Sequence, residues 1–150
     1  MAQKVLFVCT GNTCRSSMAE VIARQVLKSQ GREKEIEISS AGLAAWPGAP
    51  ASKEAVTVMQ EMGLDLSKHR AKLLTPEMVK QAGLILTMTR MHRVQVCEMV
   101  PEAANKTFTL VAYAGESDED IIDPLGYSIN VYRKCATTLK DLITQVFKKP

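Results

Sequence analysis

Short apolar runs alternate with amphipathic stretches along this chain of 150 residues. Runs rich in β-branched or large apolar residues predict buried strands at residues 4–8, 35–40, 84–88 and 108–110. Apolar residues at helical spacing predict helices at residues 17–30, 52–62, 90–99 and 128–147, and a further helix start at residues 75–77. The early strand–helix–strand order is typical of a parallel sheet. We therefore predict one α/β domain over residues 1–150, with three layers and a roughly four-stranded parallel sheet flanked by helices.

Local signals mark the ends of several elements. Ser16 and Ser17 are candidate N-caps of the first helix. Gly63 is expected to end the second helix. Residues 41–50 are expected to form a loop, and His92 is expected to be a solvated residue on its helix.

The composition mainly excludes classes of protein. A hydrophobic content of 46% and a charged content of 23% are typical of a soluble globular domain. The net charge of +3 is small, and the basic residues are scattered along the sequence rather than clustered, so we expect no nucleic-acid partner. We find neither a signal peptide nor a long apolar run, and expect a cytoplasmic protein with no membrane partner. The cysteines lack the spacing of a disulfide framework or a zinc site, so we expect reduced thiols, no metal and no cofactor.

The stretch that follows the first predicted strand carries the chemistry. Cys9 and Arg15 frame a C-x5-R loop that runs from a strand end into a helix start. A loop of this length can point several N–H groups inward, and Gly11 and Asn12 tolerate the positive φ that this requires. Arg15 can close the ring around an oxyanion. A cysteine inside such a ring is favoured as thiolate, which suits nucleophilic attack on phosphorus.

These residues carry a resemblance to a known family. The stretch "VCTGNTCRS", with a later "DP" at residues 123–124, resembles the low-molecular-weight protein tyrosine phosphatases. The resemblance extends over nearly the whole chain, through "MAE", "SAG", "LSKH", "ILTMT" and "DPLGYS". It implies a single phosphatase domain that acts on phosphorylated protein substrates. Nothing in the sequence marks a subunit interface, and we expect a monomer.

The resemblance also implies roles for individual residues. Cys9 would be the nucleophile that forms a phosphocysteine, Arg15 the clamp on the transition state and Asp123 the general acid. The phosphate-binding loop would consist of Thr10, Gly11, Asn12, Thr13, Cys14 and Arg15. A hydrogen-bonded network that holds this loop would consist of Asn12, Ser16, Ser40 and His69.

Thr13 and Leu125 bear on the substrate. Tyrosine-specific members of the family usually have a larger aliphatic residue in place of Thr13, whereas the branch with threonine resembles the protein arginine phosphatases. Leu125 stands where tyrosine phosphatases have an aromatic residue that stacks on the phenol ring. The arginine branch has an aromatic residue there too, so Leu125 departs from both. We predict phosphoarginine as the substrate, with phosphotyrosine as the alternative.

Other readings of the same residues are weaker. An arsenate reductase would need two further cysteines as a relay, and Cys97 and Cys135 are far apart in the sequence. A module that binds phosphate without turnover would not need Cys9, Arg15 and Asp123 together. Cys14 is either a buried packing residue or a redox partner of Cys9 that forms a reversible disulfide.

Overall fold

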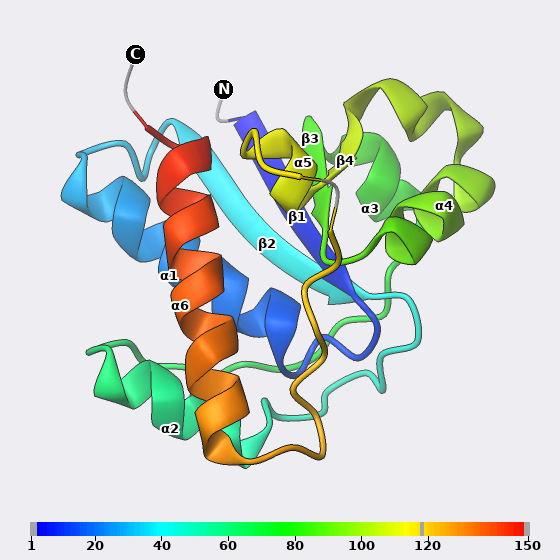
Figure 1. Ribbon diagram of the computed structural model, residues 1–150. Helices are drawn as coiled ribbons and strands as arrows, with labels where there is room; N and C mark the ends of the chain where they lie inside the picture. Colours follow the sequence, from blue (N-terminus) through cyan, green and yellow to red (C-terminus); the bar gives the residue numbers. More distant parts are fainter. Residues whose placement is uncertain (1–2, 118, 149–150) are drawn as a thin grey trace.

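The computed structural model describes residues 3–117 and 119–148, whose strands form a single parallel sheet (Figure 1). The strand order is β2-β1-β3-β4, and every neighbouring pair is parallel. The strands are β1 (Gln3–Cys9), β2 (Ile36–Gly42), β3 (Leu84–Thr87) and β4 (Thr107–Thr109). The predicted fold class is confirmed.

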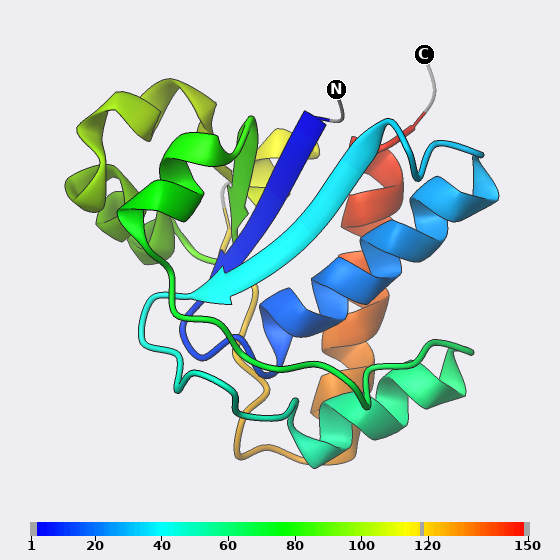
Figure 2. The same ribbon diagram turned by 180° about the vertical axis from the view of Figure 1, so that it is seen from behind.

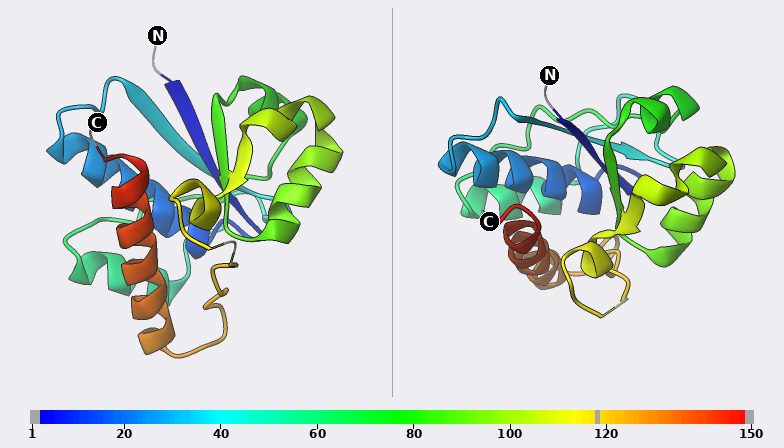
Figure 3. Two further views of the ribbon diagram at one scale, coloured as in Figure 1. Left: turned by 45° about the horizontal axis from the view of Figure 1, so that its top comes forward. Right: turned by 90° about the horizontal axis from the view of Figure 1, so that it is seen from above.

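Helices cover both faces of the sheet. They are α1 (Arg15–Ser29), α2 (Lys53–Glu61), α3 (Pro76–Gln81), α4 (Arg90–Met99), the 3-10 helix η1 (Pro101–Lys106), α5 (Leu110–Tyr113) and α6 (Ile129–Val146). Figures 2 and 3 show α1, α2 and α6 on one side of the sheet and α3 and α4 on the other.

The alternation of side chains along β1 explains these layers. Val5 and Phe7 belong to a buried cluster with residues of α1, α2 and α6. Leu6 and Val8 belong to a separate cluster with residues of α3 and α4. β1 is therefore buried on both faces, as its continuous apolar sequence predicts. Its carboxyl end lies beside the ends of β2 and β3, since Cys9 pairs with Gly42 and Val8 with Thr87.

The predicted start of the first helix is wrong. α1 begins at Arg15, its N-cap is Cys14, and neither Ser16 nor Ser17 caps it. Ser17 Oγ instead donates to the Cys14 carbonyl over 2.9 Å, and the Ser16 hydroxyl is engaged by the loop described below. The end of the second helix is as predicted, because α2 stops just before Gly63, which has φ 78°.

Some elements differ from the predicted ones in extent. β2 continues to Gly42, into the stretch predicted as a loop. The fourth strand ends at Thr109, whose hydroxyl accepts from Ala112 N over 3.2 Å and so starts α5, a helix too short for a clear periodic signal. No helix among the described residues is long and apolar enough to cross a bilayer.

Candidate active site

The loop of residues 10–14 joins β1 to α1 at the carboxyl edge of the sheet, beside the segment between α5 and α6 (Figure 1). β1 ends at Cys9 and α1 begins at Arg15, so the strand and the helix place the two ends of the loop. No side chain caps α1. The uncapped N-terminus of a helix attracts anions through its N–H groups and its dipole.

Two backbone features shape this loop. Asn12 has φ 57°, while Gly11 does not have a positive φ, so the left-handed residue is the asparagine and not the glycine. Gly42, at the end of β2, lies against the loop. A Cβ atom there would come within 2.5 Å of the Thr10 carbonyl oxygen and 2.9 Å of Asn12 N. The close approach of β2 to the loop therefore requires glycine at position 42.

The Cys9 sulfur is buried and lies within hydrogen-bond distance of the loop and of the first turn of α1. The backbone N–H of Asn12 donates to Cys9 Sγ over 3.2 Å, and Ser16 Oγ lies 2.8 Å from the same sulfur. Both are positioned to stabilise negative charge on the sulfur. The structure thus places the predicted nucleophile at the floor of the predicted phosphate-binding loop.

The direction of the Ser16 hydrogen bond follows from its neighbours. The backbone N–H of Lys72 donates to Asn12 Oδ1 over 2.9 Å, which fixes the orientation of the asparagine amide. Asn12 Nδ2 then donates to Ser16 Oγ over 2.8 Å. Because Ser16 accepts from Asn12, its own hydrogen is free to point at Cys9 Sγ. Ser16 can therefore donate to the sulfur, and it is the only possible donor of the pair when Cys9 is a thiolate, which has no proton to give.

The same network extends away from the sulfur. Asn12 Nδ2 also donates to Ser40 Oγ over 2.9 Å, and Ser40 donates to the buried Glu20 carboxylate over 2.6 Å. Arg24 lies 2.8 Å from the other oxygen of Glu20. His69 Nε2 donates to the Asn12 carbonyl over 2.6 Å. The structure thus brings together the four residues predicted to support the loop, and adds Glu20 and the Lys72 amide, which the sequence argument missed.

Arg15 and Asp123 form an ion pair next to the loop. Arg15 Nη2 lies 3.5 Å from Asp123 Oδ2, and Arg15 Nη1 donates to the Ile121 carbonyl over 2.9 Å. Asp123 Oδ1 accepts from Leu125 N over 3.1 Å, so the aspartate also organises the turn that follows it. Arg15 is buried and Asp123 is partly exposed. The buried Arg15 is suited to hold phosphoryl oxygens. The partly exposed Asp123 is suited to exchange a proton with a leaving group or with water.

The prediction for His92 is wrong. His92 is only 4% exposed, and its Nε2 lies 2.9 Å from Thr10 Oγ1 in the loop. Burial and the nearby Arg15 lower its pKa to about 4, against the opposing effect of Asp120 and Asp123. The sequence contained a signal for this burial. His92, Val96 and Val100 follow each other at intervals of four residues, and all three are buried.

The residues predicted to affect specificity and redox behaviour lie around the loop. Thr13 is half-buried, and its carbonyl accepts from Ser52 N over 3.0 Å. Leu125 is exposed. Cys14 is buried, with its sulfur 3.4 Å from Ser52 Oγ and 3.5 Å from the Tyr132 hydroxyl. Burial and the contact with Cys14 raise the pKa of Tyr132.

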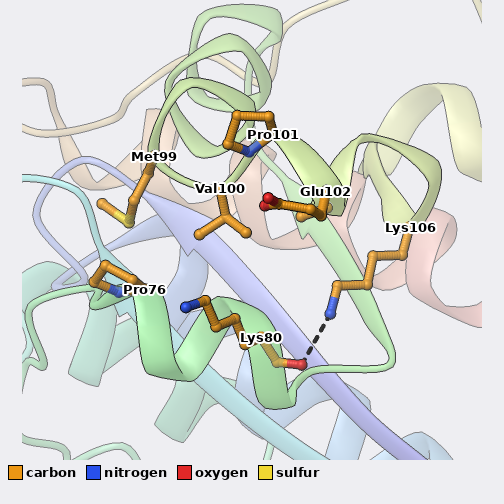
Figure 4. A pocket seen from close by; sticks show the side chains of 8 residues that line it. Pro76, Lys80, Met99, Val100, Pro101, Glu102 and Lys106 are labelled. Atoms are coloured by element: carbon orange, nitrogen blue, oxygen red, sulfur yellow. Dashed lines mark hydrogen bonds between the residues drawn. The ribbon is translucent and has the colours of Figure 1, made fainter.

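A separate hollow of about 500 Å³ lies elsewhere, between α3 and the corner of α4 and η1 (Figure 4). Lys106 Nζ does not point freely into it, because it donates to the carbonyls of Lys80 and Ala82 at the end of α3. None of the residues of the phosphate-binding loop lines this hollow. Within residues 3–117 and 119–148, no group of three or more His, Cys, Asp or Glu side chains is arranged to hold a metal ion.

Comparisons with known proteins agree with this geometry. Residues 4–149 match the family described as low molecular weight phosphotyrosine protein phosphatase. A protein-arginine-phosphatase of Geobacillus stearothermophilus is 40% identical over 99% of this chain and 97% of its own length.

Two solved structures are also similar. One is a low molecular weight protein tyrosine phosphatase from T. tengcongensis, with a TM-score of 0.93 and 44% identity over 99% of this chain and all of its own. The other is a mutant of the YwlE arginine phosphatase with a phosphorylated active-site serine, with a TM-score of 0.91 and 34% identity over 96% and 93% of the two chains. This protein belongs to the low molecular weight phosphotyrosine protein phosphatase family and is a cysteine-dependent phosphatase.

Proposed function

We propose that this phosphatase hydrolyses phosphoarginine on proteins. The observation that carries the proposal is Thr13, a small hydroxyl-bearing residue on the loop that surrounds Cys9. Its Oγ1 lies 3.6 Å from the place that a Cβ atom on Gly11 would occupy, so the side chain lies beside Gly11 in the loop. A short polar side chain leaves room for the planar guanidinium group and offers it a hydrogen-bond acceptor. The exposed Leu125 supplies no aromatic ring to stack on a phenol.

The similar proteins support the proposal without deciding it. The relative from Geobacillus stearothermophilus is named as an arginine phosphatase, and the structure from T. tengcongensis as a tyrosine phosphatase. Their identities to this chain, 40% and 44%, are close. Overall similarity therefore does not separate the two substrates, and the choice depends on the side chains around the loop.

In the proposed first step, the Cys9 thiolate attacks phosphorus and the P–N bond to the arginine breaks. Loop amides and Arg15 hold the three equatorial oxygens. Asp123 gives a proton to the departing guanidino nitrogen, so arginine leaves as guanidinium. A phosphocysteine forms on Cys9. The phosphorylated serine described for the YwlE mutant supports a covalent intermediate at this position.

In the proposed second step, water attacks the phosphocysteine. Asp123, now a carboxylate, takes a proton from the water, and the S–P bond breaks. The electron pair of that bond returns to Cys9 as a thiolate. The hydroxyl of Ser16, which points at this sulfur, stabilises the thiolate as it leaves.

The test is to measure kcat/KM on a phosphoarginine peptide and a phosphotyrosine peptide of matched sequence, with Cys9→Ser as the blank. We expect a preference for phosphoarginine, and a loss of about 10² to 10⁴ in kcat on either peptide in Asp123→Asn. Thr13→Ile should shift the preference toward phosphotyrosine. Thr13→Val, which keeps the shape of threonine and removes only its hydroxyl, separates the effect of polarity from that of size. A wild-type preference for phosphotyrosine that Thr13→Ile leaves unchanged would refute the proposal.

We also propose that Cys14 protects Cys9 by a reversible disulfide. The two thiols are the ends of one short loop segment, and both are free in the structure. Oxidation by peroxide would convert Cys9 to a sulfenic acid, which Cys14 would attack with loss of water. In Cys14→Ser, peroxide should therefore inactivate the enzyme beyond recovery by thiols, whereas the wild type should recover. Equal recovery of both would exclude this protection.

A relay of the arsenate reductase type finds little support in the remaining cysteines. Burial raises the pKa of the Cys135 thiol to about 12, so it is a poor nucleophile. Cys97 lies on α4, a helix that packs on the other face of the sheet from α6, which carries Cys135. Oxidation of thioredoxin that depends on arsenate would be the result that revives this reading.

A further inference from the structure

The contact between His92 and Thr10 has no role in the proposed two-step mechanism. Thr10 is the first residue of the loop after Cys9, and its side chain is exposed. His92 comes from α4, more than eighty residues further along the chain, and meets Thr10 Oγ1 at 2.9 Å. The network of Asn12 acts near β2, whereas this contact acts near β3 and α4. It therefore holds the opposite side of the loop.

The position of His92 is well determined by the fold. Thr89 caps α4, and its hydroxyl accepts from the backbone N–H of His92 over 3.0 Å. The strand before this helix pairs with β1, and Met88 N donates to the Val8 carbonyl over 3.1 Å. The strand that carries Cys9 therefore also fixes the position of His92, through β3 and the start of α4. A buried ring on such a support has little freedom to move.

The hydrogen-bond partners of His92 indicate its tautomer. Its Nδ1 is buried and has no partner in the structure. A buried N–H without an acceptor is rarer in proteins than a buried lone pair without a donor. Nδ1 is therefore the unprotonated nitrogen, and the Nε2–H group donates to Thr10 Oγ1. Since Thr10 accepts this hydrogen bond, its own hydrogen is free to turn toward a group bound in the loop.

We propose that His92 is a positioning residue for the phosphoryl group: it holds Thr10 through Nε2–H and leaves the Thr10 hydroxyl to donate to a phosphoryl oxygen. This inference rests on the proposed binding of phosphate by the loop, but it does not depend on which phosphorylated residue is the substrate. His92 does not touch the reacting atoms. It acts through Thr10. Its effect is to keep the loop in the arrangement that binds the transition state, so its loss should lower kcat.

The experiment compares His92→Phe, His92→Gln, Thr10→Val and the double variant of His92→Phe with Thr10→Val. An aryl phosphate is the substrate, because it reports on the loop whether the protein substrate carries phosphoarginine or phosphotyrosine. Met91→Phe, at an exposed neighbour on α4, is the matched control and should behave as the wild type. kcat, KM, inhibition by inorganic phosphate and the thermal midpoint are measured for each.

We expect His92→Phe, which keeps a ring and removes the donor, to lower kcat about three- to tenfold with little change in KM. His92→Gln, whose amide nitrogen reaches nearly the same place as Nε2, should recover most of this loss. The double variant should be no worse than the more impaired single variant, because both remove one interaction. Inhibition by inorganic phosphate should change as little as KM, because both report binding in the ground state.

Three results would overturn the proposal. The first is that the effects of His92→Phe and Thr10→Val multiply, which would mean that the two residues act independently. The second is that His92→Gln loses as much kcat as His92→Phe, which would mean that the ring acts by packing. The third is that nitrogen chemical shifts of the wild type show the proton on Nδ1 rather than Nε2, a result that does not depend on whether any variant folds. Loss of the proposed phosphoarginine activity alone would leave all three readouts intact.

Discussion

The two sides of the phosphate-binding loop are held in different ways. On the side of β2, Asn12 makes hydrogen bonds with Ser16, Ser40 and the Lys72 amide, and the chain of contacts continues to a charged pair. On the side of β3, the neutral ring of His92 meets the side chain of Thr10. The first side fixes the backbone and the direction of the hydrogen bond to Cys9. The second side holds only the side chain of Thr10. Damage at Gly42 or Asn12 on the first side should therefore cost more activity than damage at His92 on the second.

The largest effect should come from crowding the loop on the side of β2. In Gly42→Ala, the added Cβ would lie 2.5 Å from the Thr10 carbonyl oxygen. This contact is too short, and because the neighbour is backbone, it can be relieved only by moving the loop away from β2. A displacement of this kind typically costs about 10²-fold in rate. We expect at least that loss in kcat/KM on an aryl phosphate.

Gly83→Ala is the matched control for this change. Gly83 lies just before β3, and a Cβ atom there would come no closer than 3.4 Å to the flexible side chain of Gln3. Its activity should stay within about twofold of the wild type, as for most substitutions away from a site. If Gly42→Ala were equally active, the close approach of β2 would not position the loop.

A smaller but still large effect should follow from removing the Asn12 amide. Asn12→Gly keeps access to the positive φ and removes the hydrogen bonds, whereas Asn12→Ala adds backbone strain to the same loss. Supporting residues of this kind are commonly worth about 10- to 100-fold in activity. We expect Asn12→Gly to lose that much kcat, and Asn12→Ala to lose more. If Asn12→Gly kept full activity while Asn12→Ala did not, the asparagine would serve only the backbone conformation.

The comparison also shows what the sequence can and cannot predict. The side of β2 could be predicted, because Asn12, Ser16, Ser40 and His69 lie in motifs that resemble those of a family with a known loop. The sequence nevertheless makes Ser16 a candidate N-cap of α1, because its spacing does not reveal that a nearby sulfur competes for its hydroxyl. Asn12 and not Gly11 takes the positive φ because the asparagine amide is anchored by Lys72, a contact between residues 60 positions apart. Such tertiary contacts override local preference.

His92 shows the other kind of failure. It lies outside the motifs that carry the family resemblance, and the sequence predicts a solvated residue there. Its spacing with Val96 and Val100 indicates the buried face of α4, but burial alone does not say what the ring touches. Only the packing of α4 beside the end of β1 brings it to Thr10. The hydrogen bond joins two elements that the sequence places far apart.

An intermediate effect is expected at the outer end of the network. Ser40→Ala would leave the buried Glu20 without the hydroxyl that donates to it over 2.6 Å, while Asn12 would keep its other contacts. Leaving a buried polar group unpaired typically costs about 1–3 kcal/mol. We expect a loss of that size in the free energy of unfolding, measured by urea denaturation, and only a few-fold loss in kcat. A hundredfold loss in kcat with unchanged stability would contradict this division.

The smallest effect on activity at neutral pH is expected on the side of His92, where the change should appear in the pH dependence of stability. The pKa of His92 is about 4 in the folded protein, against an ordinary value of 6.5. Between these two pH values the unfolded chain binds a proton that the folded protein does not. The free energy of unfolding should therefore fall as pH decreases from 6.5 toward 4, by up to about 1.4 kcal/mol per pH unit from this residue. Well above pH 6.5 His92 is neutral in both states and contributes no slope.

His92→Gln removes this titration, so the difference in the free energy of unfolding between the variant and the wild type should depend on pH. The wild type should lose stability faster than the variant as pH falls from 6.5 to 4, when both are followed by urea denaturation. Arg15, Asp120 and Asp123 surround the ring and remain in both proteins, so their own titrations largely cancel in the difference. Met91→Phe should keep the wild-type slope. Parallel curves for the wild type and His92→Gln would mean that His92 takes up a proton as readily in the folded protein as in the unfolded chain, and that the side of β3 is less closed to water than its burial indicates.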